Sequence, residues 1–269
     1  SAMKKTVATA GMLLLLAFIV CPILWVVLTS LKPEPEILRL PVVWLPSSIT
    51  WEHYRSVLSD TSVHRYIGNS LLVSIATSVL ATLLGSLAAY GFGRHRFRGR
   101  SFLLGLFLLI HLLPNLVSMT ALYRICASVH LLNSLMGLVF VKAAGLSLVV
   151  WLLKGYFESL PPEYEEMARV DGCSTLGIFF RVILPLRIRG ILVTGLFFFA
   201  QSWKSFFLPL LLITRTDKMT LPLGIYQYVG EHGFEIGKIC ALSVISMVPI
   251  LFLLFALNRV GWESLRPSG

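Results

Sequence analysis

Long runs of sequence without a charged residue are the feature that most constrains this chain. Four stretches, 6–31, 66–93, 101–123 and 239–258, contain no Asp, Glu, Lys or Arg, and each has at least 20 residues. That is the length an α-helix needs to cross roughly 30 Å of hydrocarbon. Soluble domains carry about a quarter of their residues as charged side chains, whereas here the share is 13%. The chain is therefore expected to span a membrane rather than to fold in water.

Two further apolar runs, 125–153 and 190–214, are each interrupted by one lysine, Lys142 and Lys204. With them the sequence predicts an all-α polytopic membrane protein with six transmembrane helices in one transmembrane domain over 1–269. The predicted spans are about 6–31, 67–93, 101–124, 131–153, 188–213 and 238–259, with an external loop over 32–66 and a long cytoplasmic loop over 154–187. Prolines limit helix formation in the external loop, where we expect one short helix around 51–59. The first span is expected to be retained, because no small-x-small cleavage site follows it.

The formal net charge of +10 suggests nucleic acid in a soluble protein, but here the positive-inside rule accounts for it. Thirteen Lys and Arg residues fall in segments predicted to be inside and eight in those predicted to be outside. The densest basic cluster, over 94–100, is a short loop, where the rule is strongest. We expect a multi-pass protein of a bacterial cell (inner) membrane, with both termini cytoplasmic, in contact with lipid and not with nucleic acid.

Small residues recur at every fourth position of the second span, at Ala81, Gly85, Ala89 and Gly93. Such a stripe lets another helix approach closely, which matters in lipid because apolar burial does not drive helix association there. The alternative is that Ala and Gly are simply common in membrane helices.

The cytoplasmic loop over 154–187 is far longer than a helix connection requires. Pro161-Pro162-Glu163 is typical of a helix start, and Tyr164, Met167 and Ala168 then share one face of the expected helix. A helix that lies on a lipid surface favours Lys and Arg on its polar face, but this one is acidic. The pattern therefore favours docking into a groove of a partner protein.

The same loop carries a gapped motif. Residues 166–172 read Glu-Met-Ala-Arg-Val-Asp-Gly, and nine residues later 182–185 read Val-Ile-Leu-Pro. This pattern resembles the EAA loop of bacterial ABC-importer permeases, with Met167 and Val182 as mild departures. Further segments resemble the carbohydrate-importer branch, in particular maltose-permease (MalG-like) subunits. These segments are 30–33 (Ser-Leu-Lys-Pro), 68–71 (Gly-Asn-Ser-Leu), 94–99, 131–134 (Leu-Leu-Asn-Ser), 203–210 and 220–224 (Thr-Leu-Pro-Leu-Gly).

The resemblance implies the type I ABC-importer permease fold with a cytoplasmic coupling helix that binds an ATPase. It also implies a second permease subunit, an ABC ATPase dimer, an extracytoplasmic solute-binding protein or lipoprotein, and a sugar-like substrate. The expected ATPase-binding residues are Glu163, Tyr164, Glu166, Met167, Ala168, Asp171, Gly172, Leu184 and Pro185. Glu166 would pair with an ATPase arginine, or alternatively cap its own helix, and Gly172 would supply a turn that a β-carbon obstructs.

Polar groups inside membrane spans are costly and are therefore candidates for a solute path. The candidates are Asn115, Gln201, Trp203 and Lys204, with Lys142 and His111 as further polar groups in spans. Lys204 also departs from the family, where asparagine is common. The alternatives are that Lys204 snorkels or pairs at a subunit interface and that Trp203 is a packing residue. The four cysteines show no CxxC spacing, so no metal site is expected.

Catalytic and nucleotide-binding motifs are absent from the sequence. It contains no phosphate-loop pattern G-x-x-x-x-G-K-[ST], so ATP and Mg²⁺ would act on a partner ATPase and this chain would bind no cofactor. HExxH and GxSxG are absent as well, which argues against an intramembrane enzyme. The expected function is a permease subunit that forms half of the pore for a sugar or oligosaccharide. The alternatives are an importer for another solute, such as a polyamine or phosphate ester, and an ion-coupled secondary transporter.

Overall fold

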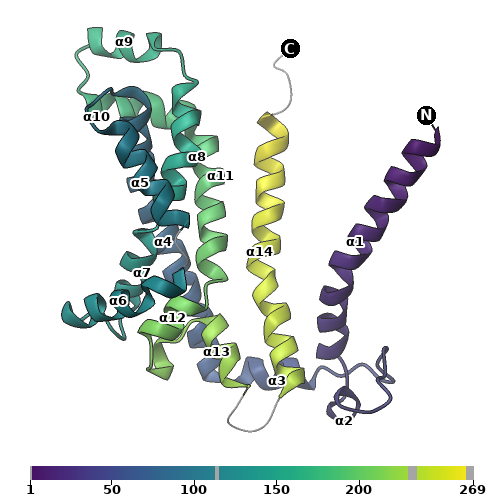
Figure 1. Cartoon of the computed structure of the whole chain (residues 1–269). Coiled ribbons are helices and arrows are strands. Elements are labelled where there is room, and N and C mark those ends of the chain that lie inside the picture. Colours follow the sequence, from purple (N-terminus) through teal and green to yellow (C-terminus); the bar gives the residue numbers. More distant parts are fainter. Residues whose placement is uncertain (1, 113–114, 230–234, 265–269) are drawn as a thin grey trace. The chain divides into compact units, whose positions relative to one another are not determined.

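The computed structural model describes residues 2–112, 115–229 and 235–264, with the backbone alone for 2–5, 110–112, 115–118 and 258–264. Helices make up the described secondary structure, and no strand occurs in it. The predicted all-α fold class is thus confirmed (Figure 1). The chain forms two compact units, one of Ser1–Arg65 with Leu221–Leu251 and one of Tyr66–Thr220 with Phe252–Gly269.

The first unit begins with a long apolar helix and continues into the predicted external loop. Its helices are α1 (Ala2–Ser30), α2 (Glu34–Ile37), α3 (Glu52–Ser59), α13 (Leu221–Gln227) and the part of α14 (Ile236–Ser264) up to Leu251. The short helix expected around 51–59 is confirmed as α3. Lys32 is buried just after α1, with its ammonium 4.4 Å from the centre of the Trp25 ring. His53 Nε2 donates to the Lys32 carbonyl at 2.8 Å, which ties α3 to the end of α1.

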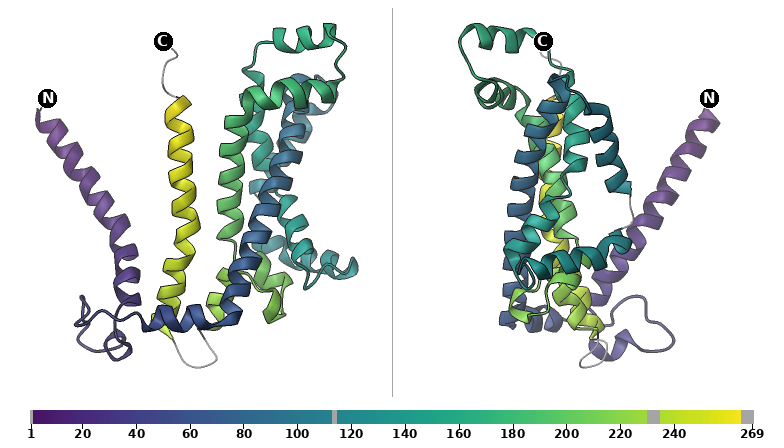
Figure 2. Two further views of the ribbon diagram at one scale, coloured as in Figure 1. Left: turned by 180° about the vertical axis from the view of Figure 1, so that it is seen from behind. Right: turned by 60° about the vertical axis from the view of Figure 1, so that its left-hand side comes forward.

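The second unit is a bundle in which α4, α5, α8 and α11 run side by side (Figures 1 and 2). Its long elements are α4 (Thr61–Arg94, whose first turn belongs to the first unit), α5 (Arg100–Leu112), α6 (Asn115–Ser128), α7 (Leu135–Ala143), α8 (Ser147–Glu158) and α11 (Leu184–Trp203). Its short elements are α9 (Glu163–Val170), α10 (Thr175–Ile178), the π-helical turn η1 (Phe179–Ile183), α12 (Phe207–Leu212) and the 3₁₀ turn η2 (Thr216–Lys218).

The stripe of small residues on α4 is a packing seam. Ala81 and Ala89 are fully buried, and a β-carbon on Gly85 would lie 2.6 Å from Val149 Cγ1 of α8. A β-carbon on Gly93 would lie 3.4 Å from the Lys154 carbonyl oxygen of the same helix. These distances confirm that the stripe allows close approach of a second helix, here α8.

The structure does not reproduce six uninterrupted spans. In the part of the chain that the structure describes, four helices are long and apolar enough to cross a membrane. The pair α7 and α8, bent by 46°, makes a fifth if it is counted as one span. The predicted span over 101–124 is divided into α5, which ends at Leu112, and α6, which begins at Asn115. Residues 113 and 114, between these two helices, lie outside the described part of the chain.

The predicted span over 188–213 is also interrupted. Helix α11 ends at Trp203, and α12 begins only at Phe207. Pro209 explains the break, because its ring would clash with the carbonyl of residue 205 in a continuous helix and cannot donate to it. The interruption leaves residues 204–206 outside both helices, which matters for the cavity described below.

Candidate functional site

Helix α9 is formed by a local sequence with signals at both ends. Pro162 stands at the N-cap, and three glutamates in the first turn complement the positive end of the helix. The helix ends at Val170, and Gly172 follows with a φ of +79°. A β-carbon at Gly172 would meet no atom within 4 Å. The turn predicted there is confirmed, but its cause is the left-handed backbone conformation and not crowding of a side chain.

One face of α9 is fixed to the helical bundle. Glu165 and Ala168 are buried, and Glu165 Oε1 lies 2.5 Å from Arg94 Nε at the end of α4. The Arg94 and Glu165 side chains are only 13% and 7% exposed. Arg94 also donates to the Pro161 carbonyl at 3.3 Å. The ion pair therefore attaches the start of α9 to α4, with Arg169 adding a weaker contact to Glu165 at 3.6 Å.

Sequence reasoning missed Glu165. Its position three residues before Ala168 was the available signal, because residues so spaced share one helix face. Among the predicted partner-binding residues, the structure places Ala168 on this inward face, while Glu163, Glu166 and Asp171 are exposed.

A second face of α9 carries three exposed apolar side chains. Tyr164, Met167 and Val170 recur at three-residue intervals with exposed fractions of 46%, 69% and 88%. We call these three residues the outer face of α9. An amphipathic helix normally buries its apolar side, whereas α9 buries a glutamate and an alanine and leaves its largest apolar groups uncovered.

Leu184 and Pro185 lie in a different part of the unit. Together α10, η1 and α11 form one continuous helix over Thr175–Trp203, and the two residues sit at the start of α11 within it. The Leu184 N–H donates to the Phe179 carbonyl, five residues back. This π-helical register precedes Pro185, which has no N–H of its own to donate. The structure thus separates Leu184 and Pro185 from the outer face of α9 and places them in the helix that follows the loop.

Basic residues gather at the same end of the bundle as α9. Besides Arg94, Arg100 pairs with Glu158 at 2.6 Å and Lys154 pairs with the same carboxylate at 2.8 Å. The Arg187 guanidinium lies 4.4 Å from the centre of the Tyr156 ring. The basic loop over 94–100 and the loop that carries α9 are therefore joined by ion pairs and face the same compartment.

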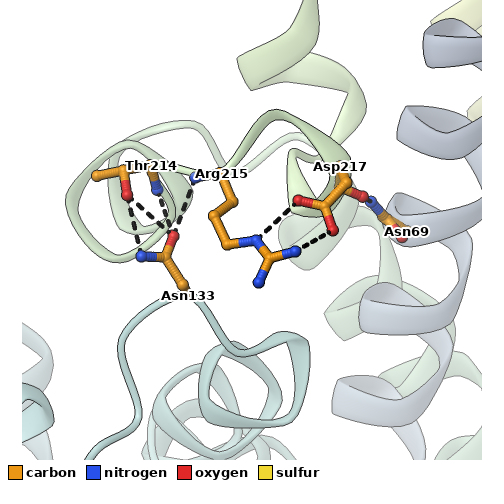
Figure 3. A network of polar contacts seen from close by, with 5 residues as sticks. All are labelled: Asn69, Asn133, Thr214, Arg215 and Asp217. Carbon is orange, nitrogen blue, oxygen red and sulfur yellow. Dashed lines mark hydrogen bonds and ion pairs between the residues drawn. The ribbon is translucent and has the colours of Figure 1, made fainter.

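A polar network closes the other end of the bundle (Figure 3). It lies about 37 Å along α4 from Arg94, since Asn69 is 25 residues earlier at 1.5 Å per residue. Asn69 Nδ2 donates to the carbonyls of Asp217 and Met219 at 3.0 and 2.9 Å. Asn133 Oδ1 accepts from the Thr214 and Arg215 amides at 2.7 and 3.0 Å.

Two motifs quoted for the family resemblance thus meet in one place, Gly-Asn-Ser-Leu at 68–71 and Leu-Leu-Asn-Ser at 131–134. They meet at the segment 214–219, which directly precedes a third quoted motif, 220–224. Within this network the Arg215 side chain, by its hydrogen bonds to the Asp217 carboxyl, holds the pKa of that carboxyl below its usual value. Sequence reasoning did not predict the contacts of Asn69 and Asn133 with the segment 214–219, because nothing local connects residues 80 or more positions apart.

A cavity of about 530 Å³ opens where α11 is interrupted. Its walls come from α4, α6, α7, α11, α12 and the segments beside them. Lys142 lines it and is only 7% exposed. The Lys142 ammonium donates to the Ser202 carbonyl at 3.0 Å and approaches the Ser202 hydroxyl at 3.4 Å.

The structure brings some of the predicted solute-path residues to this cavity. Gln201 and Lys204 line it. Trp203 does not; it is buried and stacked on Phe199 with ring centres 5.9 Å apart. The side chains of Asn115 and His111 lie outside the described residues. In the part of the chain that the structure describes, no group of three His, Cys, Asp or Glu side chains could hold a metal ion.

Comparison with known proteins gives a consistent result. The model of a family described as "Binding-protein-dependent transport system inner membrane component" matches residues 81–260. The sulfoquinovosyl glycerol transport system permease protein SmoH of Agrobacterium fabrum is 32% identical, over 87% of this chain and 82% of that protein. The diacetylchitobiose uptake system permease protein DasC of Streptomyces coelicolor is 33% identical, over 90% and 88%.

Solved structures share the fold. One chain of a bacterial ABC transporter involved in the import of the acidic polysaccharide alginate superposes with a TM-score of 0.80. The match covers 96% of this chain and 98% of that chain at 20% sequence identity. The overall helical architecture described above is therefore shared with this solved chain.

Proposed function

The chain belongs to the family of binding-protein-dependent transport system inner membrane components. From that premise we propose that it is one permease subunit of an ATP-driven ABC importer for a sugar or oligosaccharide. The curated relatives at 32% and 33% identity are named as permeases for a sulfoquinovosyl glycoside and for diacetylchitobiose. Both substrates are saccharides, which supports this substrate class for the present chain. A second permease subunit would form the other half of the pore.

Energy for transport comes from a separate ATPase dimer in this proposal. The sequence has no phosphate-binding loop of its own, so ATP and Mg²⁺ belong to that partner. The family name supports a binding protein that delivers the solute. The solute route passes the cavity lined by Gln201 and Lys204, the polar lining of the interrupted span.

The outer face of α9 is the observation that carries the proposal. An apolar surface on a short helix, presented by a fixed inner face, suits insertion into a groove of a partner protein. The glutamates at 163 and 166 are exposed beside it and are available for ion pairs with basic groups of the ATPase. Movement of the ATPase would act on α4 through the Arg94–Glu165 pair, because this pair links the docked helix to the bundle.

The basic loop sets the orientation in the same proposal. Arg94, Arg96, Arg98 and Arg100 lie within seven residues at the end of the bundle that carries α9. The positive-inside rule favours the cytoplasm for such a short basic loop. The ATPase would then dock from the cytoplasm, and both termini of the chain would be cytoplasmic.

Co-purification tests the docking. The chain is expressed with the partner permease and ATPase encoded beside it, and ATPase recovery is measured on a tagged copy of this chain. Met167→Arg places a charge in the centre of the outer face, and we expect at least a tenfold loss of ATPase recovery and of ATP-dependent uptake.

Leu38→Arg is the matched control, since Leu38 is a similarly exposed apolar residue, 72% against 69% for Met167, in the predicted external loop. Recovery of the ATPase with Met167→Arg at the wild-type level would contradict the docking. Equal losses with both variants would show a general folding defect instead of a lost contact, and would also count against it.

A further inference from the structure

The cavity at the interruption of α11 has a charge that its walls do not balance. Two of its lining residues, Lys142 and Lys204, are cationic, and no Asp or Glu is among the described residues that line it. The sequences of the five helices that contribute walls, α4, α6, α7, α11 and α12, contain no acidic residue at all. The excess positive charge is therefore a property of the whole site and not of one side-chain conformation.

Lys142 is the more buried of the two lysines. Its ammonium is buried and its two hydrogen bonds go to neutral oxygens of Ser202. Among the described residues no carboxylate lies within ion-pair distance of Lys142. A cation buried at membrane depth without a counter-charge is unfavourable, and an anionic ligand in the adjoining cavity would supply that charge.

Neutral donors accompany the lysines. The Thr77 hydroxyl of α4 is fully buried, lines the cavity and has no hydrogen-bond partner. Gln201 contributes an amide to the same walls. Buried hydroxyls are nearly always hydrogen-bonded, so Thr77 is a donor without an acceptor. The rings of Phe198, Phe206 and Phe207 complete the lining and offer apolar surface to the C–H face of a sugar ring.

We propose that this cavity binds the acidic group of an anionic saccharide during import. The carboxylate or sulfonate oxygens accept hydrogen bonds from Lys142 and Thr77, and Lys204 adds a second positive charge at the exposed side. The inference rests on the proposed function and narrows its substrate class from sugars in general to sugars that carry a fixed negative charge. A saccharide oxyanion meets both the charge of the lysines and the aromatic lining.

Transport by the complete importer tests the proposal. Both permease subunits, the ATPase and the binding protein are reconstituted in liposomes, and ATP-dependent uptake is measured for two acidic probes, a uronate disaccharide and a sulfonated glycoside. Each probe is paired with a neutral counterpart, the carboxyl-reduced disaccharide and the unsulfonated glycoside. We expect uptake of at least one acidic probe, and the two arms distinguish a carboxylate from a sulfonate.

Two variants test the assigned residues. Lys142→Met keeps the length of the side chain and is expected to lower kcat/KM for the acidic probe about tenfold to a hundredfold, while Lys142→Arg retains most of it. Thr77→Val removes a hydroxyl that has no partner in the protein, so a purely structural role predicts no effect. We expect it to raise KM for the acidic probe about threefold to tenfold. Lys218→Met, a lysine outside the cavity, is the control and should leave uptake unchanged.

Several results would overturn the inference. They are uptake of neutral saccharides alone, uptake of an acidic probe that is the same in Lys142→Met and wild type, and no response to either acidic probe. Each leaves the permease assignment intact, provided that the ATPase still co-purifies with the chain. Co-purification of the ATPase with wild type and Met167→Arg tests the proposed function, whereas uptake of the acidic probes tests this inference. Failure of one can therefore be told apart from failure of the other.

Discussion

The attachment of α9 to α4 through Arg94 and Glu165 leads to a quantitative prediction. Both side chains are largely buried and their charged atoms are 2.5 Å apart. Removing one partner of a buried ion pair typically costs about 3–5 kcal/mol. The lower end applies here, because Arg94 keeps its hydrogen bond to the Pro161 carbonyl. We therefore expect Glu165→Ala to weaken the docking of α9 on the bundle by about 3 kcal/mol, or roughly a hundredfold in the docking equilibrium.

Glu165→Gln separates charge from hydrogen bonding. The amide oxygen can still accept from Arg94 Nε, so only the charge-assisted part is lost, about 1–1.5 kcal/mol or roughly tenfold. Native-state hydrogen exchange over residues 158–174 measures local opening directly. Protection of this segment should fall by the same factors, while protection of the helical bundle stays unchanged. ATP hydrolysis by the assembled importer should continue and uptake should fall, because the helix no longer transmits motion to α4.

Glu163→Gln and Glu166→Gln are the matched controls, since both residues are exposed glutamates in the same helical turn. Neither should alter protection. The exchanged pair Arg94→Glu with Glu165→Arg should recover part of the loss, which a double-mutant cycle reports as a coupling energy. Unchanged protection in Glu165→Ala, or full additivity in the cycle, would refute the argument that this pair holds the helix.

Three further changes have defined outcomes. Gly172→Ala forces a β-carbon into the left-handed region at φ +79° and should destabilise the end of α9 by about 1–2 kcal/mol, seen as faster hydrogen exchange of the same segment. Gly85→Val overpacks the seam between α4 and α8, where even a β-carbon lies 2.6 Å from a neighbour. It should cost about 1–3 kcal/mol, whereas Gly91→Ala, which meets nothing within 4 Å, should leave the thermal midpoint in detergent unchanged. The lowered pKa of Asp217 beside Arg215 means that the ion pair stabilises the folded state above the unfolded pKa of about 3.9 and that this contribution is lost as the pH falls through the lower folded value. The difference in thermal midpoint between wild type and Asp217→Asn should therefore be constant from about pH 8 to 5 and shrink as the pH falls below the unfolded pKa of about 3.9.

Much of the helical scaffold follows from local sequence. Charge-free runs long enough to cross a bilayer predict α1, α4 and α14, and small residues at every fourth position predict the seam on α4. The acidic first turn and Gly172 predict the ends of α9. In each case the physical cause lies within a few turns of the chain, as a hydrophobic length, a helix periodicity or a backbone conformation.

The sequence predicts the breaks in the helices less well. The sequence around Pro209 shows that a helix is perturbed, but not that α11 ends at Trp203 and leaves Lys204 beside a cavity. At the end of α11 the Ser202 carbonyl accepts a hydrogen bond from Lys142, which lies 60 residues earlier in the chain. Periodicity contains no information on such distant pairs.

The burial of the Glu165 side chain also depends on a residue that is distant in the sequence. Three glutamates follow Pro162 within one helical turn, and their local context hardly distinguishes them. Which of them turns inward is decided by Arg94, 71 residues earlier. The family resemblance predicted Glu163 and Glu166 as partner contacts, and Glu165 was overlooked because its partner belongs to another helix.

The uncovered outer face of α9 also bears on how cells keep the subunits of this importer in balance. A copy of the chain that inserts into the membrane without its ATPase presents Tyr164, Met167 and Val170 to water. Exposed apolar residues of this kind are what chaperones and proteases bind when they survey newly made proteins. If the outer face of α9 docks the ATPase as proposed, the same three residues would also mark an orphan subunit for removal and so enforce the stoichiometry of the complex.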